Sequence, residues 1–120
     1  MDKKRIGQIK QQFDLVVQRD EEAQIEYWLA RDLMPLLGYE RWENFYKAIV
    51  RAIESCETSS VEVSDHFRET TKMVLLGSGS KRSVIDYMLT RYACYLIAQN
   101  GDPKKEEIAF AQSYFALQTR

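Results

Sequence analysis

A chain of 120 residues is long enough to bury one hydrophobic core and too short for two, so its length predicts a single domain. Its apolar content of 45% and charged content of 29% are those of a folded protein, which excludes extended disorder. The net charge of -1 excludes a generic polyanion binder, so any surface for nucleic acid must come from local segregation of charge.

The first quarter of the chain predicts a helix followed by a strand. Apolar side chains recur at helical spacing from residue 3 to about 19, which predicts an amphipathic helix. An acidic turn at 20–22 ends this helix, and residues 25–29 are rich in β-forming side chains that partly alternate, as in a short strand. We also expect a soluble, cytoplasmic protein, because no apolar run near the start fits a signal peptide or a membrane span.

Two helices joined by a glycine come next. A short helix is predicted over residues 30–37, and Gly38 can supply the left-handed residue that ends it. The second helix, from about 41 to 56, has the clearest helical period in the chain. Its polar outer face carries Asn44, Lys47 and Arg51.

The middle of the chain predicts a β-hairpin. Residues 57–69 are polar and irregular, with a short turn at 64–67. Residues 73–76 and 84–89 read as two strands joined by a flexible turn at 77–82.

The last part predicts two further helices. Thr90 can cap a helix that runs to Gln99 and is apolar nearly all round, as in a central buried helix. A joint at 100–103 separates it from a final helix over 103–118. We expect a shared core from six large side chains of these helices: Trp42, Phe45, Ile49, Tyr95, Leu96 and Phe115.

The final helix carries two adjacent apolar stripes, which together are wider than a surface helix of a small domain needs. Phe110, Tyr114 and Leu117 form the second stripe, and we expect it to be an interface with a second copy or with further chain. The alternative is a helix buried deep in the domain's own core.

The short helix, the glycine turn and the second helix have the order of a helix-turn-helix, with the hairpin as a wing. Between residues 72 and 91 there are four basic residues and one acidic residue, Asp86, which is a local positive excess suited to phosphates. The alternative is a pair of packed helices with a solvated outer face and a basic hairpin that serves only solubility. The predicted nucleic-acid-binding residues are those of the second helix and the hairpin: Asn44, Lys47, Arg51, Lys72, Lys81 and Arg82.

No catalytic, metal or cofactor site is predicted. Gly77 and Gly79 are one residue apart and lack the spacing of a nucleotide-binding loop. His66 has no matched catalytic partners nearby, so we expect a structural role for it, and no enzymatic activity. Cys56 and Cys94 each lie in a predicted helix among core residues, so we expect buried, reduced thiols, and their spacing fits no zinc site.

The sequence resembles the N-terminal part of the DNA-damage-inducible protein D family, which is related to the BRO-type N-terminal domains of phage and viral antirepressors. The most specific matching segment is 89–103, and further matches are at 26–33, 36–39, 42–45, 65–67, 111–116 and 118–120. The resemblance implies that residues 1–120 form one domain from the N-terminal part of a longer protein. It supplies no catalytic residues.

Residues and resemblance together predict an α+β fold, mostly helical, with a helix-turn-helix-like pair and a small antiparallel hairpin or sheet, in a BRO-type or winged-helix-like arrangement. The predicted function is a non-enzymatic DNA-binding regulatory domain of the bacterial DNA-damage (SOS) response or of prophage regulation. The alternative is a protein-interaction module that modulates a recombinase or repressor without contacting DNA. A homodimer is a further expectation. The sequence does not distinguish single-stranded from double-stranded DNA as the ligand.

Overall fold

The structure is a computed structural model that describes residues 3–102 and 104–118, without the side chains of the last two. It has an α+β fold with five α-helices, one short 3-10 helix and a four-stranded antiparallel sheet in the described residues. In chain order the elements are α1 (Lys3–Val16), β1 (Gln18–Asp20), β2 (Ile25–Leu29), α2 (Ala30–Leu36), α3 (Trp42–Thr58), η1 (Val63–Asp65), β3 (Phe67–Leu75), β4 (Lys81–Leu89), α4 (Arg91–Gln99) and α5 (Glu106–Gln118).

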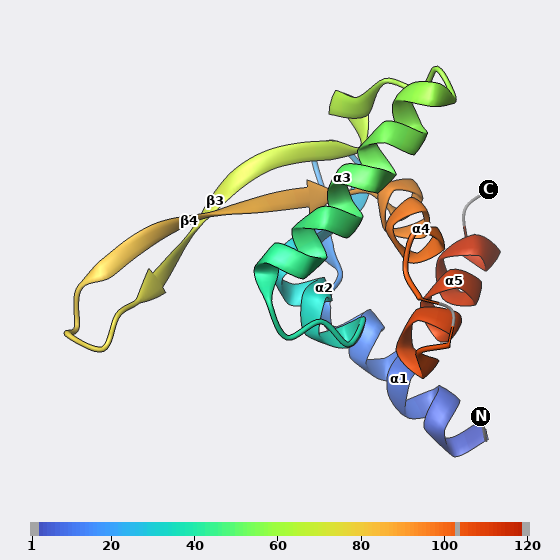
Figure 1. Ribbon diagram of the computed structural model, residues 1–120, viewed down its shortest axis with the longest axis horizontal. Helices are drawn as coiled ribbons and strands as arrows, with labels where there is room; N and C mark the ends of the chain where they lie inside the picture. The colour runs from blue at the N-terminus through green and yellow to red at the C-terminus, as the bar shows by residue number, and fades with distance from the viewer. Residues whose placement is uncertain (1–2, 103, 119–120) are drawn as a thin grey trace.

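The strands lie in the order β1-β2-β4-β3, with every neighbouring pair antiparallel. Residues opposite one another in such a register share a face of the sheet. Trp28 lies opposite Leu89, and Leu89 lies opposite Phe67, so these three buried side chains form one inner face. The helices pack on this face and leave the two long strands β3 and β4 projecting from the body (Figure 1).

The predicted end of the first helix and the predicted start of one strand need correction. The first helix was expected to reach about residue 19, but α1 ends at Val16 and Gln18–Asp20 form β1. All three β1 residues are exposed, so no apolar alternation signals the strand, and only its pairing with β2 defines it. The strand expected at 73–76 begins at Phe67 and ends at Leu75 instead, because residues 67–72, most of them polar, pair with residues 84–89 of β4.

The predicted helices fall close to their expected bounds. Gly38 follows α2 with a φ of +81°, as expected for a residue that reverses the chain after a helix. The Thr90 hydroxyl accepts a hydrogen bond from the Ala93 amide at 3.2 Å and so caps α4. The final helix begins at Glu106 rather than 103, and Pro103 lies outside the described residues.

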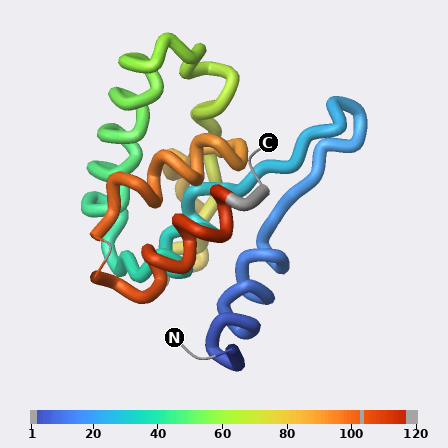
Figure 2. The backbone as a smooth tube through the Cα atoms, turned by 90° about the vertical axis from the view of Figure 1, so that its right-hand side faces the viewer, coloured from blue at the N-terminus to red at the C-terminus, as the bar shows by residue number. Residues whose placement is uncertain are grey.

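The core forms between the inner face of the sheet and the five α-helices of the described residues. Phe45, Ile49 and Phe115 are fully buried, and the other three predicted core residues pack against the same cluster while partly exposed: Trp42, Tyr95 and Leu96. Both cysteines are buried free thiols, and burial raises the pKa of each. Figure 2 shows α5 between α4 and α1, so the first and the last helix both cover the core.

Arg91 joins the sheet to the last helices. Its Nη2 atom lies 2.5 Å from Glu26 of β2, and its guanidinium lies 4.8 Å from the Trp28 ring centre. The Arg91 side chain is 12% exposed and that of Glu26 is 30% exposed, so this ion pair is partly shielded from water and links α4 to β2.

Candidate nucleic-acid interface

The β3–β4 hairpin forms a projecting arm, which we define as residues 70–85. Its tip is a tight turn in which the Leu76 amide donates to the Ser80 carbonyl at 2.8 Å. Gly79 has a φ of +86°, a conformation that other residues rarely adopt, and so permits this turn. The tip is therefore built to be narrow and polar, with Ser78 and Ser80 hydroxyls 2.8 Å apart.

The strand register sorts the basic side chains of the hairpin onto two faces. Arg82 lies opposite Val74, and Lys72 lies opposite Val84 two residues along, so both are on the outer face. Arg68 also lies on this face, nearer the body. Lys81 lies opposite Leu75 and therefore belongs to the inner face. We call the surface of Arg68, Lys72 and Arg82 the basic face of the hairpin.

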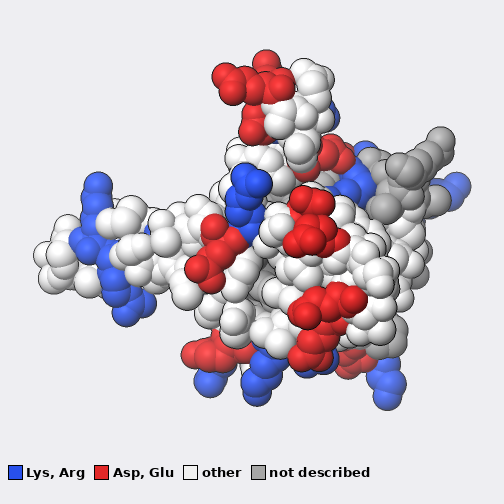
Figure 3. Space-filling model, turned by 90° about the horizontal axis from the view of Figure 1, so that it is seen from above, with Lys and Arg blue, Asp and Glu red and all other residues white. Residues whose placement is uncertain are grey.

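The arm is locally cationic. Residues 70–85 contain three basic residues and no acidic residue, whereas the whole chain has a net charge of -1. Figure 3 shows basic side chains gathered near the far end of the arm, with the acidic side chains visible in that view lying nearer the body. The Lys72 Nζ atom lies 3.8 Å from Asp32 of α2, but the two side chains are 44% and 30% exposed, so the pair is weak and open to competition.

A buried carboxylate fixes the arm to the body. Asp86 is 1% exposed and accepts hydrogen bonds from the amides of Arg31 (2.9 Å) and Tyr87 (2.8 Å). Arg31 in turn donates from Nε to the Ile85 carbonyl at 2.7 Å and stacks 4.1 Å from the Trp42 ring centre. At the point where β2 ends, the N-terminus of α2 therefore lies along the edge of β4 in place of that strand.

The predicted residues of α3 are exposed but lie apart from the arm. Asn44 and Arg51 line a hollow with the turn after α2 and the turn after α4, and Arg51 donates to the Asn100 carbonyl at 3.2 Å. On the opposite flank of α3, Tyr46 stacks on Tyr87 of β4 at 6.3 Å between ring centres. Lys47 lies on the solvent side between these flanks, so the six predicted residues form two groups rather than one surface.

The hollow beside α3 includes basic groups that the sequence did not single out. Arg41 lines it, and Lys105 lies 4.9 Å from the ring centre of Tyr39. Glu40 and Asp102 line it as well, so its charge is mixed. No periodic pattern marks Arg41 or Lys105, because both lie in turns that only the tertiary fold brings together.

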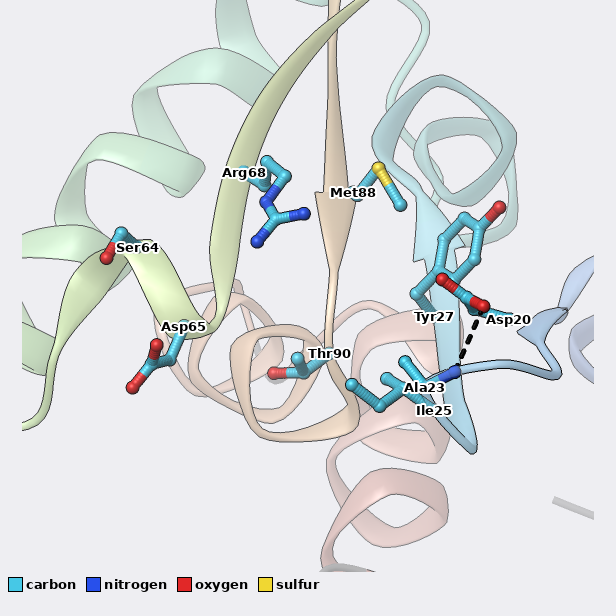
Figure 4. A pocket seen from close by; sticks show the side chains of 9 residues that line it. All are labelled: Asp20, Ala23, Ile25, Tyr27, Ser64, Asp65, Arg68, Met88 and Thr90. Atoms are coloured by element: carbon cyan, nitrogen blue, oxygen red, sulfur yellow. Dashed lines mark hydrogen bonds between the residues drawn. The ribbon is translucent and has the colours of Figure 1, made fainter.

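A second hollow lies on the outer face of the sheet. Figure 4 shows Arg68, Met88 and Tyr27 side by side across β3, β4 and β2, with Asp65 at one end of the row and Asp20 at the other. Two carboxylates beside one guanidinium disfavour a phosphate at this place. The basic face of the hairpin therefore ends at this hollow, on the side toward the body of the domain.

His66 has a structural position. Its Nδ1 atom lies 2.6 Å from the Thr90 hydroxyl, and its ring packs against Tyr92 at 4.8 Å between centres. Within the described residues, no three His, Cys, Asp or Glu side chains gather as metal ligands, and no helix is long and apolar enough to cross a membrane.

The second stripe of α5 packs largely within the chain. Tyr114 is 7% exposed and donates from its hydroxyl to Asp14 of α1, while Phe110 is half-buried with its ring 5.5 Å from Phe13. The side chain of Leu117 lies outside the described part of the chain. Packing against α1 therefore buries much of this stripe within the described residues, and an interface with a second copy stays a prediction.

Comparison with known proteins places the chain in a family. Residues 15–116 match the BRO family, N-terminal domain. Over 95 residues, or 79% of the chain, the sequence is 52% identical to a protein described as DNA damage-inducible protein D of Escherichia coli (strain K12). The match covers 35% of that protein, so the chain spans about a third of the curated relative. No solved structure matches at a significant level. The match across nearly the whole described fold shows that this chain belongs to the BRO family through its N-terminal domain.

Proposed function

We propose that this protein is a non-enzymatic DNA-binding regulatory domain that acts in the bacterial cytoplasm. The observation that carries the proposal is the arm, a narrow projection with three basic residues and no carboxylate in a chain of net charge -1. A role in the DNA-damage response is supported by the relative's description as damage-inducible, and a role in prophage regulation or antirepression by the resemblance to phage proteins.

The proposed mode of binding uses the arm as a wing. A two-stranded β-ribbon fits the major groove of B-DNA, and exposed lysine and arginine side chains bind its phosphates. Lys72 and Arg82 would bind phosphates from the basic face, with Lys81 at the tip. Phosphate oxygens would replace the weak contact of Lys72 with Asp32.

In this proposal α2 and α3 act as a helix-turn-helix-like pair that makes a second contact. Asn44, Lys47 and Arg51 are exposed on α3, and an asparagine amide can pair with an adenine edge. These residues lie on a different flank from the arm. Substitutions in α3 and substitutions in the arm are therefore expected to lower DNA affinity independently of one another.

The test is binding to labelled single-stranded and duplex DNA across a salt series. Arg82→Glu should lower affinity and reduce the salt slope by about one unit, because one phosphate contact is lost. Lys4→Glu, which makes the same type of charge change on exposed α1, is the matched control and should change affinity much less. Equal losses for both variants would show that only overall charge matters.

The alternative function is a protein-interaction module that modulates a recombinase or a repressor. The nearly balanced charge of the whole chain, with 17 basic and 18 acidic residues, favours it, because long-range attraction to DNA is then weak. If the folded domain does not bind DNA even at low salt, that result would support the protein-interaction function instead.

A further inference from the structure

The inner face of the arm carries an unpartnered apolar surface. Met73, Leu75 and Ile85 are 59%, 73% and 47% exposed. The register places them together with Thr71 and Ser83, on the face opposite Lys72 and Arg82. The arm is therefore two-sided, with a basic face and an apolar face.

The arm also lacks the support that a hairpin usually needs. β2 pairs with β4 only at Met88 and Leu89, so the described sheet has just two strands from there outward. Figure 1 shows this part of the hairpin extending beyond the helices. Because an isolated two-stranded hairpin is marginal in water, a surface that buries its apolar face would stabilise it.

The charges on the apolar face make it complementary to itself. Glu69 lies just before the arm on the continuation of this face, opposite Tyr87, and Lys81 lies on it at the tip, opposite Leu75. Six residues of strand, about 20 Å, separate the two ends. Two such faces can pack against each other in antiparallel orientation about a two-fold axis. Lys81 of each copy then lies beside Glu69 of the other copy, and the apolar side chains pack between these two ion pairs.

We propose that the apolar face of the arm binds the same face of a second copy of this chain, with Lys81 of each copy paired with Glu69 of the other. Contacts in a two-fold dimer occur twice, so each apolar side chain and each ion pair counts double. The exposed ring of Tyr46, which is 41% accessible beside Tyr87, extends the apolar surface toward the body. Lys72 and Arg82 stay on the free side of the arm and remain available to phosphates, whereas Lys81 is occupied by the ion pair in the dimer.

The first test is sedimentation of the chain over a concentration series. The chain is expected to form dimers, and Met73→Glu should raise the dimer dissociation constant at least about 100-fold, since Met73 lies opposite Ser83 in the middle of the face and two charges would be buried without partners. Leu15→Glu is the matched control, because Leu15 on α1 is 75% exposed and should leave dimerisation unchanged. Unaltered melting temperatures would show that both variants fold. A chain that stays monomeric at every concentration overturns the proposal.

A charge exchange tests the orientation. Glu69→Lys and Lys81→Glu should each weaken the dimer by about tenfold, because each removes two ion pairs and creates two repulsions. The double variant should restore dimerisation, whereas continued weakness would overturn the antiparallel pairing. Arg82→Glu separates this proposal from DNA binding: it should lower DNA affinity and leave the dimer intact, and loss of the dimer in that variant would contradict the assignment of faces.

Discussion

The body and the arm are stabilised in different ways. In the body, helices far apart in sequence bury Phe13, Phe45 and Phe115 completely, and burial supplies most of the stabilisation. In the arm, local pairing of β3 with β4 defines the structure while apolar side chains stay exposed. Substitutions in the body should therefore change the free energy of unfolding, and substitutions in the arm should change binding.

The largest expected effect tests the body. Phe45→Ala should lower the free energy of unfolding by about 3–5 kcal/mol, because the ring is fully buried and leaves a cavity. Met73→Ala in the arm should cost less than about 0.5 kcal/mol. Chemical denaturation measures both, and similar losses for the two variants would contradict the contrast between the regions.

The next effect concerns the junction of the two regions. Asp86→Ala should cost about 2 kcal/mol, because the buried amides of Arg31 and Tyr87 lose their acceptor. The arm should also become more mobile relative to α2. Asp32→Ala, which removes a half-exposed carboxylate on the same helix, is the control and should cost much less.

A smaller effect depends on pH. Hydrogen bonds from Lys10 and then Tyr114 lower the pKa of Asp14, so this carboxylate stabilises the fold above about pH 4 and the gain is lost as pH falls further. Burial and then Asp14 raise the pKa of Tyr114, so its contribution is present below about pH 10 and is lost at higher pH. Tyr114→Phe should lower the free energy of unfolding by about 1 kcal/mol at neutral pH. It should also reduce the dependence of that free energy on pH at both the acid and the alkaline end. An unchanged profile would mean that the contact is too exposed to matter.

The smallest effect on stability is expected at the outer face of α3. Asn44→Ala should leave the melting temperature nearly unchanged, since the side chain is exposed. Competition between labelled duplexes should show a weaker sequence preference with little loss of overall affinity, because an amide reads a base edge rather than a charge. A uniform loss across all sequences would instead indicate a phosphate contact.

The sequence predicted the elements whose patterns are local. The apolar period of α3, the threonine cap of α4 and the strand at 25–29 all have residue-level signals, and the structure confirms them. β1 had no such signal, because its residues are exposed and polar and only the neighbouring strand gives them their conformation. The match to the BRO family bears out the resemblance that the segment 89–103 carried most strongly.

The arrangement of the candidate site was less predictable. The basic residues of the hairpin were recognised from composition, but a one-residue change of register reverses the faces of a strand. Lys81 and Arg82 are adjacent and so lie on opposite faces of β4, and the pairing of Lys81 with Leu75 decides which face each one occupies. The distance between the arm and the outer face of α3 depends on how helices pack, and the contact of Arg51 with Asn100 joins segments 49 residues apart.

The position of β3 at the edge of the sheet has a consequence for amide hydrogen exchange. In an antiparallel pair, successive amides of an edge strand point alternately toward the partner strand and toward solvent. Exchange along β3 should therefore alternate between slow and fast from one residue to the next. Two arms that meet face to face leave the outward amides fast, whereas two β3 edges joined by hydrogen bonds would make them slow, so one deuterium-uptake profile distinguishes these geometries.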